Sequence, residues 1–170
     1  MTLNHVFTGK VAQVTGAGAG MGLPAAQAFA AAGASTPSST RTPTQHGPRP
    51  TSWSQPLNSS SNAGPEPGPT RSAHVAAKHA VTALATSAAL GEGHHGIRVN
   101  AVCPSIIQAP MVERMVAAGE LDKDAMAQGT AIGRIGLASE VTDAVLWLSR
   151  PAPASVTGVA LPVDGGLAAG

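Results

Sequence analysis

Residues 8–34 read TGKVAQVTGAGAGMGLPAAQAFAAAGA, and this stretch decides the fold that the rest of the chain is expected to adopt. Its first part, residues 8–15, is a short apolar run that is typical of a buried strand entering a turn. An alanine-rich segment follows the turn, and it predicts a helix that ends at Gly33. The chain therefore opens with a strand, a glycine-rich turn and a helix.

The turn between that strand and that helix reads TGAGAGMG over residues 15–22. Because Gly16, Gly20 and Gly22 lack a Cβ atom, the backbone can turn sharply and approach a pyrophosphate, which then lies at the positive end of the helix. A glycine pattern can arise from composition alone in a chain with 20 glycines, but its place after the first strand favours dinucleotide binding. The candidate cofactor-binding residues of this turn are Thr15, Gly16, Gly18, Gly20, Met21 and Gly22.

The composition changes abruptly over residues 36–57, TPSSTRTPTQHGPRPTSWSQPL. This segment holds five prolines and nine serines or threonines, and no helix or strand period runs through it. Three interpretations remain open: a disordered surface insert, a functional lid, or sequence foreign to the fold, such as an out-of-frame reading of the gene. We treat residues 1–170 as a single domain in which 36–57 is a disordered low-complexity insert.

Two elements follow a serine cluster and a proline- and glycine-rich turn. A helix is expected from Ser72, with Val81, Leu84, Ala85 and Ala88 forming an apolar stripe that packs on a sheet. Residues 96–103 are typical of a buried parallel strand, which ends at Pro104.

The last third of the chain continues this alternation. Residues 109–128 form a charged segment that is expected to be mobile and surface-facing, and residues 156–163 predict a last strand that ends in Asp-Gly-Gly. Between these segments, residues 139–149 predict a helix whose inward residues are Val141, Ala144, Val145 and Leu148. Alternating strands and helices predict an α/β fold, a Rossmann-like doubly wound parallel sheet.

Composition and charge restrict the possible partners. Ten basic and nine acidic residues give a net charge of +1 without long runs of either sign, so neither nucleic acid nor an anionic membrane is an expected partner. Residues 11–40 are uncharged, but their glycines, prolines and polar residues argue against a membrane span, and no signal peptide is expected. Cys103 is the single cysteine, which excludes an internal disulfide and favours the cytoplasm. Bulky apolar residues are scarce, so we expect marginal stability.

Candidate catalytic residues lie on the helix from Ser72, whose sequence over residues 72–83 is SAHVAAKHAVTA. His74 and Lys78 are four residues apart and therefore share one face of that helix. Ser61 precedes His74 by thirteen residues. We take Ser61, His74 and Lys78 as the candidate catalytic residues.

The other histidines and the cysteine suggest no metal site. His94 and His95 are adjacent, and His79 lies five residues from His74, so none forms a pair with the i, i+4 spacing of a helical metal site. Cys103 lies on the expected buried strand and is interpreted as a small core residue rather than a nucleophile.

In combination, these motifs make the chain resemble the short-chain dehydrogenase/reductase family, whose single-domain members bind NAD or NADP. The motifs that carry the resemblance occur in the family's order along the chain. They are TGAGAGMG at 15–22, Ser61 with HVAAK at 74–78, RVNAVCPS at 98–105, GRIG at 133–136 and VTGVALPVDGG at 156–166.

The resemblance implies hydride transfer between NAD or NADP and a small-molecule carbonyl or secondary alcohol. A tyrosine at position 74 would act as general acid and base, Ser61 would hold the substrate oxygen, and Lys78 would bind the nicotinamide ribose. Pro104 and Ile107 would lie beside the nicotinamide, with the Ile107 backbone facing it. Family members assemble as homo-oligomers.

Several departures from the family's pattern bear on activity. The chain contains no tyrosine, and His74 stands where the family has one. Ser105 replaces the favoured glycine, and Ala109 replaces a threonine. Only 22 residues occupy a space where the family has three further strands with their helices, although one strand-helix-strand unit needs about 30. The chain is therefore expected to be internally truncated, which removes the residue that selects NAD or NADP and makes an oligomer doubtful.

Two functional hypotheses follow. In the first, the chain is an oxidoreductase with impaired activity, in which a neutral His74 accepts a proton although the Lys78 charge disfavours its protonated form. In the second, it is a non-catalytic remnant with residual nucleotide or partner binding. Loss of central strands would leave unpaired sheet edges and uncovered apolar surface, and we expect low stability of the isolated chain.

Overall fold

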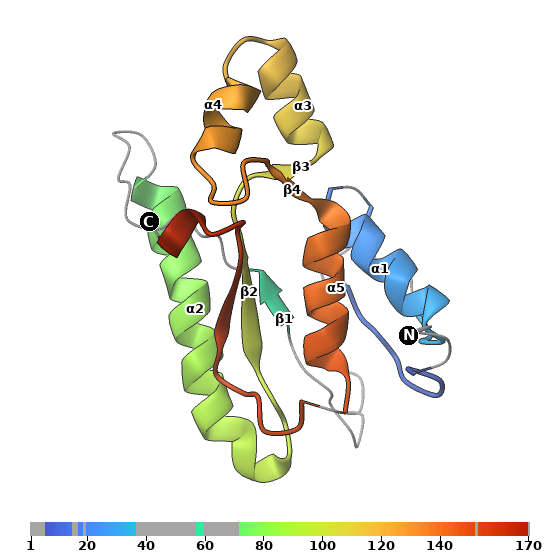
Figure 1. The fold of residues 1–170 in the computed structure, drawn as a ribbon. Coiled ribbons are helices and arrows are strands. Elements are labelled where there is room, and N and C mark those ends of the chain that lie inside the picture. Colours follow the sequence, from blue (N-terminus) through green and yellow to red (C-terminus); the bar gives the residue numbers. More distant parts are fainter. Residues whose placement is uncertain are drawn as a thin grey trace.

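The computed structural model describes residues 6–14, 17–18, 20–36, 57–59, 72–151 and 153–169, and all structural statements below concern these residues. Helices and short strands alternate along them (Figure 1). In chain order the elements are α1 (Gly22–Ala31), β1 (Leu57–Ser59), α2 (Ser72–Glu92), the 3-10 helix η1 (Gly93–His95), β2 (Asn100–Pro104), β3 (Ile107–Gln108), α3 (Pro110–Ala117), α4 (Lys123–Gln128), β4 (Gly136–Leu137), α5 (Ala138–Ser149), β5 (Ala160–Val163) and the 3-10 helix η2 (Leu167–Ala169).

A parallel sheet of three strands, in the order β1-β2-β5, forms the centre of the described molecule. Its middle strand β2 is buried along its whole length. Because successive strand residues face opposite sides, Ala101 packs with Ala85 and Ala89 of α2, whereas Val102 packs with α5. Figure 1 shows α2 on one face of the sheet and α5 with α1 on the other. This arrangement is an incomplete Rossmann-like α/β fold, as the sequence predicts.

A buried amide ties β2 to the segment that leads into β5. The side chain of Asn100 is fully buried, and its Nδ2 donates to the Val156 carbonyl oxygen at 3.0 Å. Its Oδ1 accepts the Val159 backbone N–H at 3.1 Å. Both ends of the amide are thus satisfied, as a buried polar group requires.

Helix α1 ends where the sequence predicts. Gly33 has a φ of +92°, its N–H donates to the Ala30 carbonyl, and the N–H of Ala34 donates to the Phe29 carbonyl. These two bonds form a Schellman motif, which needs a left-handed residue and therefore favours glycine. The Phe29 ring packs edge to face against Phe7, with ring centroids 5.2 Å apart. These rings and Leu146 of α5 form the core between the two helices.

The prediction of a buried strand over residues 8–15 is wrong in its extent. Within residues 8–14, the only β-structure is a bridge between Val11 and Ser35, supported by backbone hydrogen bonds that Ala12 and Ser35 donate. The Val11 side chain is 68% exposed. A buried strand needs partners on both edges and cover on both faces, and among the described residues Ser35 alone pairs with Val11.

The inward stripe predicted for α2 is partly wrong. Leu84 is 62% exposed, whereas Ala85 and Ala89 are buried against β2. Because alanine allows the helix to approach the sheet closely, the buried stripe follows the small residues instead of the leucine. The inward residues predicted for α5 are confirmed, since Val141 and Leu148 are buried in the same cluster as Val102.

The remaining expectations concern loops and boundaries. Leu57, expected to end the insert, begins β1, and residues 37–56 lie outside the described part. Residues 109–128 are mostly exposed, as expected, and contain α3 and α4. Among the described helices, none combines the length and the hydropathy that crossing a membrane requires.

Candidate functional site

The carboxyl edge of the sheet gathers the segments that the sequence predicts for the site. Strand β2 ends there at Pro104, and β5 ends there at Val163. In Figure 1, α1 and α2 both begin at this edge, and β3 and β4 lie above it. Ligands of open α/β sheets bind at this edge, outside the carboxyl ends of the strands.

The glycine-rich turn supplies the entrance to α1. Gly20 has a φ of +60°, a left-handed conformation that favours glycine, and a Cβ built on it would contact nothing within 4 Å. Met21 is the N-cap residue and provides no side-chain hydrogen bond to the helix, and the first turn from Gly22 carries no acidic residue. The positive end of the α1 dipole is therefore not neutralised by an acidic side chain of its first turn, which suits an anion. Gly18 is exposed, while Thr15 and Gly16 lie outside the described residues.

Helix α2 carries the candidate dyad in its first two turns. His74 and Lys78 are helical and one turn apart, so they lie on the same face. Lys78 is half-buried; the side chain of His74 lies outside the described part of the chain. Ser61 also lies outside it, two residues beyond the last described residue of β1, Ser59.

The segment after β2 is held against the end of β5. Pro104 is buried, and the hydroxyl of Ser105 donates to the Asp164 carbonyl oxygen at 3.3 Å. The serine found in place of the family's glycine is therefore accommodated by a contact with the Asp-Gly-Gly turn. Cys103, just before it, is buried, as predicted for a core residue.

Ile107 lies in β3 and is held by pairing with β4. The two strands are parallel, Ile107 is the register partner of Gly136, and the Gly136 N–H donates to the Ile106 carbonyl at 3.0 Å. Ile107 is 4% exposed. A Cβ on Gly136 would lie 2.6 Å from the Ile107 Cδ1, so any larger residue there would force the buried Ile107 side chain to shift.

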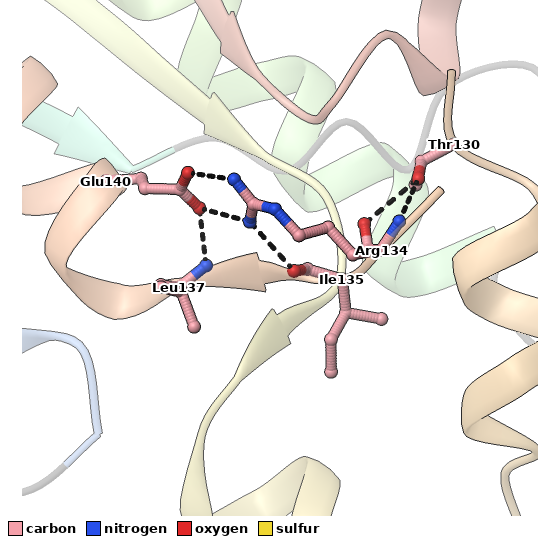
Figure 2. Close-up of polar contacts among 5 residues, drawn as sticks. All are labelled: Thr130, Arg134, Ile135, Leu137 and Glu140. Atoms are coloured by element: carbon pink, nitrogen blue, oxygen red, sulfur yellow. Dashed lines mark hydrogen bonds and ion pairs between the residues drawn. The ribbon is translucent and has the colours of Figure 1, made fainter. Parts of the chain in front are cut away.

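Arg134 and Glu140 form an ion pair around β4 that the sequence prediction missed. Figure 2 shows the two-pronged contact, with Nη2 to Oε1 at 2.6 Å and Nη1 to Oε2 at 3.0 Å. The Glu140 Oε2 also accepts the Leu137 backbone N–H at 2.7 Å. Hydrogen bonds from Arg134 and from the Leu137 backbone lower the pKa of Glu140 to about 2, and Glu140 raises the pKa of Arg134. The contact of Glu140 with the Leu137 N–H is the glutamate half of a capping box, but Leu137 has no side-chain acceptor for the other half, so the sequence carries no complete capping signal here.

Asp164 is a second polar residue without a predicted role. It is 9% exposed, its Oδ1 accepts the Gly166 N–H at 3.0 Å, and its Oδ2 accepts the Ala168 N–H at 3.0 Å. Asp164 therefore fixes the turn that follows β5 at the carboxyl edge of the sheet. We assign it a structural role.

Other parts of the described chain offer less to a ligand. His94 and His95 are exposed on η1, and no group of three metal-binding side chains occurs among the residues that the structure describes. A shallow cavity of about 570 Å³ lies between α3 and α4, and none of the predicted site residues lines it. Its lining residues are Val116, Gly119, Leu121, Asp122, Lys123 and Asp124.

Comparison with known proteins agrees with this geometry. A family model described as enoyl-(acyl carrier protein) reductase matches residues 44–168, which is well over half of the chain. The short-chain dehydrogenase srdC of Neurospora crassa is 43% identical over 97 residues, which cover 55% of this chain and 34% of that protein. The chain thus spans about a third of the length of this relative.

Solved structures also resemble the chain in their fold. The structure of ElxO with NADP bound is 28% identical, with a TM-score of 0.63, over 68% of this chain and 47% of that one. Aldohexose dehydrogenase of Thermoplasma acidophilum, in ligand-free form, is 22% identical with a TM-score of 0.78 over 99% of this chain and 96% of that one, which is a likeness of fold alone. From the family match, these relatives and the site at the carboxyl edge, it follows that the chain belongs to the short-chain dehydrogenase/reductase family of oxidoreductases.

Proposed function

We propose that the chain binds NAD or NADP at the carboxyl edge of its sheet and catalyses an impaired hydride transfer between the nicotinamide and a carbonyl or secondary alcohol. The observation that carries the proposal is the set of segments at this edge: the glycine-rich entrance to α1, the first turns of α2, and the residues from Pro104 to Ile107 after β2. The NADP bound to ElxO, a structural relative, supports the choice of ligand.

The residues present fit such a cofactor. The left-handed Gly20 and the uncharged first turn of α1 suit a pyrophosphate, and the backbone around Ile107 suits the nicotinamide. When bound, a nicotinamide cofactor supplies or accepts the hydride. The ammonium of Lys78 would hold the ribose hydroxyls, and Ser61 would donate a hydrogen bond to the substrate oxygen.

His74 is the residue on which the rate depends. Reduction of a carbonyl adds a hydride to carbon and a proton to oxygen, so an acid must stand at the substrate oxygen. A phenol would donate that proton in its ordinary neutral state, whereas an imidazole must first become protonated beside the Lys78 ammonium one turn away. The imidazole is also shorter than a phenol. Both effects reduce the rate without removing the binding site.

The test is the substitution His74→Tyr, with His79→Tyr as its matched control. His79 is on the same helix, and its exposed ring contacts the Val75 carbonyl. We expect weak or undetectable turnover of NADH or NADPH with a panel of ketones for the wild type and for His79→Tyr. We expect His74→Tyr to raise kcat by at least about 100-fold, the usual contribution of a positioned general acid.

The competing function is a non-catalytic remnant that retains nucleotide binding. It is favoured by the exposure of Val11, which is 68% exposed and makes only a single β-bridge among the described residues, where an intact fold of this class would have a buried strand. Under this hypothesis NAD(P)H binds, but His74→Tyr gives no turnover. If neither the wild type nor the variant binds NAD(P)H, both functions are excluded.

A further inference from the structure

We propose that the ion pair of Arg134 and Glu140 is a positioning device for the nicotinamide half of the cofactor, acting through β4 and β3 on the Ile107 backbone. The inference rests on the proposed function, because it assigns a role toward the same cofactor. Neither residue would touch the cofactor. Their effect would pass through β4 to its partner strand β3, which contains Ile107.

The ion pair fixes both ends of β4. Arg134 lies two residues before Gly136, and Glu140 lies three residues after Leu137. The Glu140 carboxylate accepts hydrogen bonds from the Arg134 guanidinium and from the Leu137 N–H, and Arg134 Nη1 also donates to the Ile135 carbonyl at 3.3 Å (Figure 2). The ion pair therefore holds β4 on both sides. The Arg134 guanidinium contacts the Ile135 carbonyl just before the strand, and the Glu140 carboxylate contacts the Leu137 N–H at its end.

The next step leads from β4 to Ile107. Gly136 and Leu137 are paired in parallel with Ile107 and Gln108, and the buried Ile107 side chain occupies space that a Cβ on Gly136 would need. A shift of β4 therefore moves Ile107 as well. Because an error of about 1 Å in the placement of a binding group can greatly weaken its effect, the rigidity of this pair bears directly on ligand placement.

The pairing of β3 with β4 also joins the two ends of the segment that contains α3 and α4. Residues 109–135 leave the sheet after β3 and return at β4, and Figure 1 shows α3 and α4 beyond the two strands. On the returning side, the buried Thr130 hydroxyl accepts the Arg134 backbone N–H at 3.1 Å, and it lies 2.9 Å from both the Ala127 and the Arg134 carbonyl oxygens. These contacts fix the Arg134 backbone next to the end of α4, which restricts the positions that the Arg134 guanidinium can reach.

The experiment separates positioning of the nicotinamide from folding. The variant is Glu140→Gln, which can still accept the Leu137 N–H, as a glutamine does in a capping box, but loses the charge that holds Arg134. Glu92→Gln is the matched control, because Glu92 forms an exposed pair with His95 at the other end of the molecule. Two probes are titrated: the reduced cofactor that the wild type prefers, and the same molecule without nicotinamide, ADP-ribose or its 2′-phosphate. A thermal melt of each variant establishes folding.

For Glu140→Gln we expect roughly tenfold weaker binding of the reduced cofactor, with affinity for the ADP-ribose probe unchanged within about twofold. Arg134→Lys, which keeps the charge without the planar fork, should give a smaller loss of the same kind. Glu92→Gln should change neither affinity.

Equal losses for both probes, or no loss for either, would overturn the positioning role while leaving the proposed function intact. A wild type that binds neither probe would overturn both. If Glu140→Gln does not fold, the comparison is made with Arg134→Lys, which leaves Glu140 in place as the cap of α5.

Discussion

The guanidinium of Arg98 donates a hydrogen bond from Nη2 to the carbonyl oxygen of Leu148, 2.8 Å away in the last turn of α5. The same group donates to the Arg150 and Val156 carbonyls, both at 2.9 Å. One side chain preceding β2 thereby satisfies carbonyls at the end of α5 and before β5. Burial lowers the pKa of Arg98, but a guanidinium remains charged at physiological pH.

Replacing Arg98 by lysine is expected to lower the free energy of unfolding by about 1–3 kcal/mol, because an ammonium cannot reach three carbonyls with a planar fork. Arg114→Lys, in the exposed part of α3, should change it by less than about 0.5 kcal/mol. Urea unfolding followed by circular dichroism measures both. Equal effects of the two substitutions would show that the contacts of Arg98 do not stabilise the fold.

The sequence predicts the architecture of this chain well where burial and helix signals agree. The helix over 139–149 and its inward Val141 and Leu148 are confirmed, and the Gly33 stop of α1 is confirmed by its left-handed φ. Each of these features depends on local chemistry: an apolar period or a glycine that tolerates a special conformation.

The errors arise where the outcome depends on neighbours far along the chain. Leu84 belongs to a plausible helical stripe, but the close packing of Ala85 and Ala89 on β2 turns another face inward. The run around Val11 has the composition of a strand, yet composition does not say whether partners are present to bury it.

The candidate site is predicted in part for the same reason. Gly20 and the segment after Pro104 could be identified from motifs, because motifs record the backbone that a cofactor needs. The pair of Arg134 and Glu140 was missed because the N-cap residue Leu137 is not one of the types that signal a capping box, and because the partner of Glu140 depends on the return path of the chain from α4. The predicted roles of Ser61, His74 and Lys78 stay predictions.

A second prediction concerns Gly136. A methyl group there would meet the Ile107 Cδ1 at 2.6 Å, so Gly136→Ala should force the buried isoleucine to shift and lower the free energy of unfolding by about 1–3 kcal/mol. Gly91→Ala, in the open helical surface of α2, should instead raise it by about 0.5–1 kcal/mol through helix propensity. Chemical unfolding of both variants gives the comparison. A Gly136→Ala chain as stable as the wild type would mean that the β3–β4 contact is not close-packed.

A third prediction follows from the ionisation of Glu140. Its pKa in the folded chain is about 2, below its ordinary value of 4.5, so its contribution to stability is complete above pH 4.5 and is lost as the pH falls toward 2. The difference in unfolding free energy between the wild type and Glu140→Gln should therefore be larger at pH 7 than at pH 3. Because the pair is partly exposed, 1 M salt should also reduce this difference at pH 7. A difference that does not vary with pH would contradict the assigned ion pair.

The central claim, a dinucleotide site at the carboxyl edge that begins with the turn before α1, is tested most directly by titrating NADH and NADPH while recording nicotinamide fluorescence. We expect saturable binding of at least one of them to the wild type and to Gly119→Val, and its loss in Gly20→Val. Both glycines have a positive φ and open space around them, so the two substitutions impose similar backbone strain, but only Gly20 lies in the turn. Absence of saturable binding to the wild type, or equal binding to the two variants, would contradict the account.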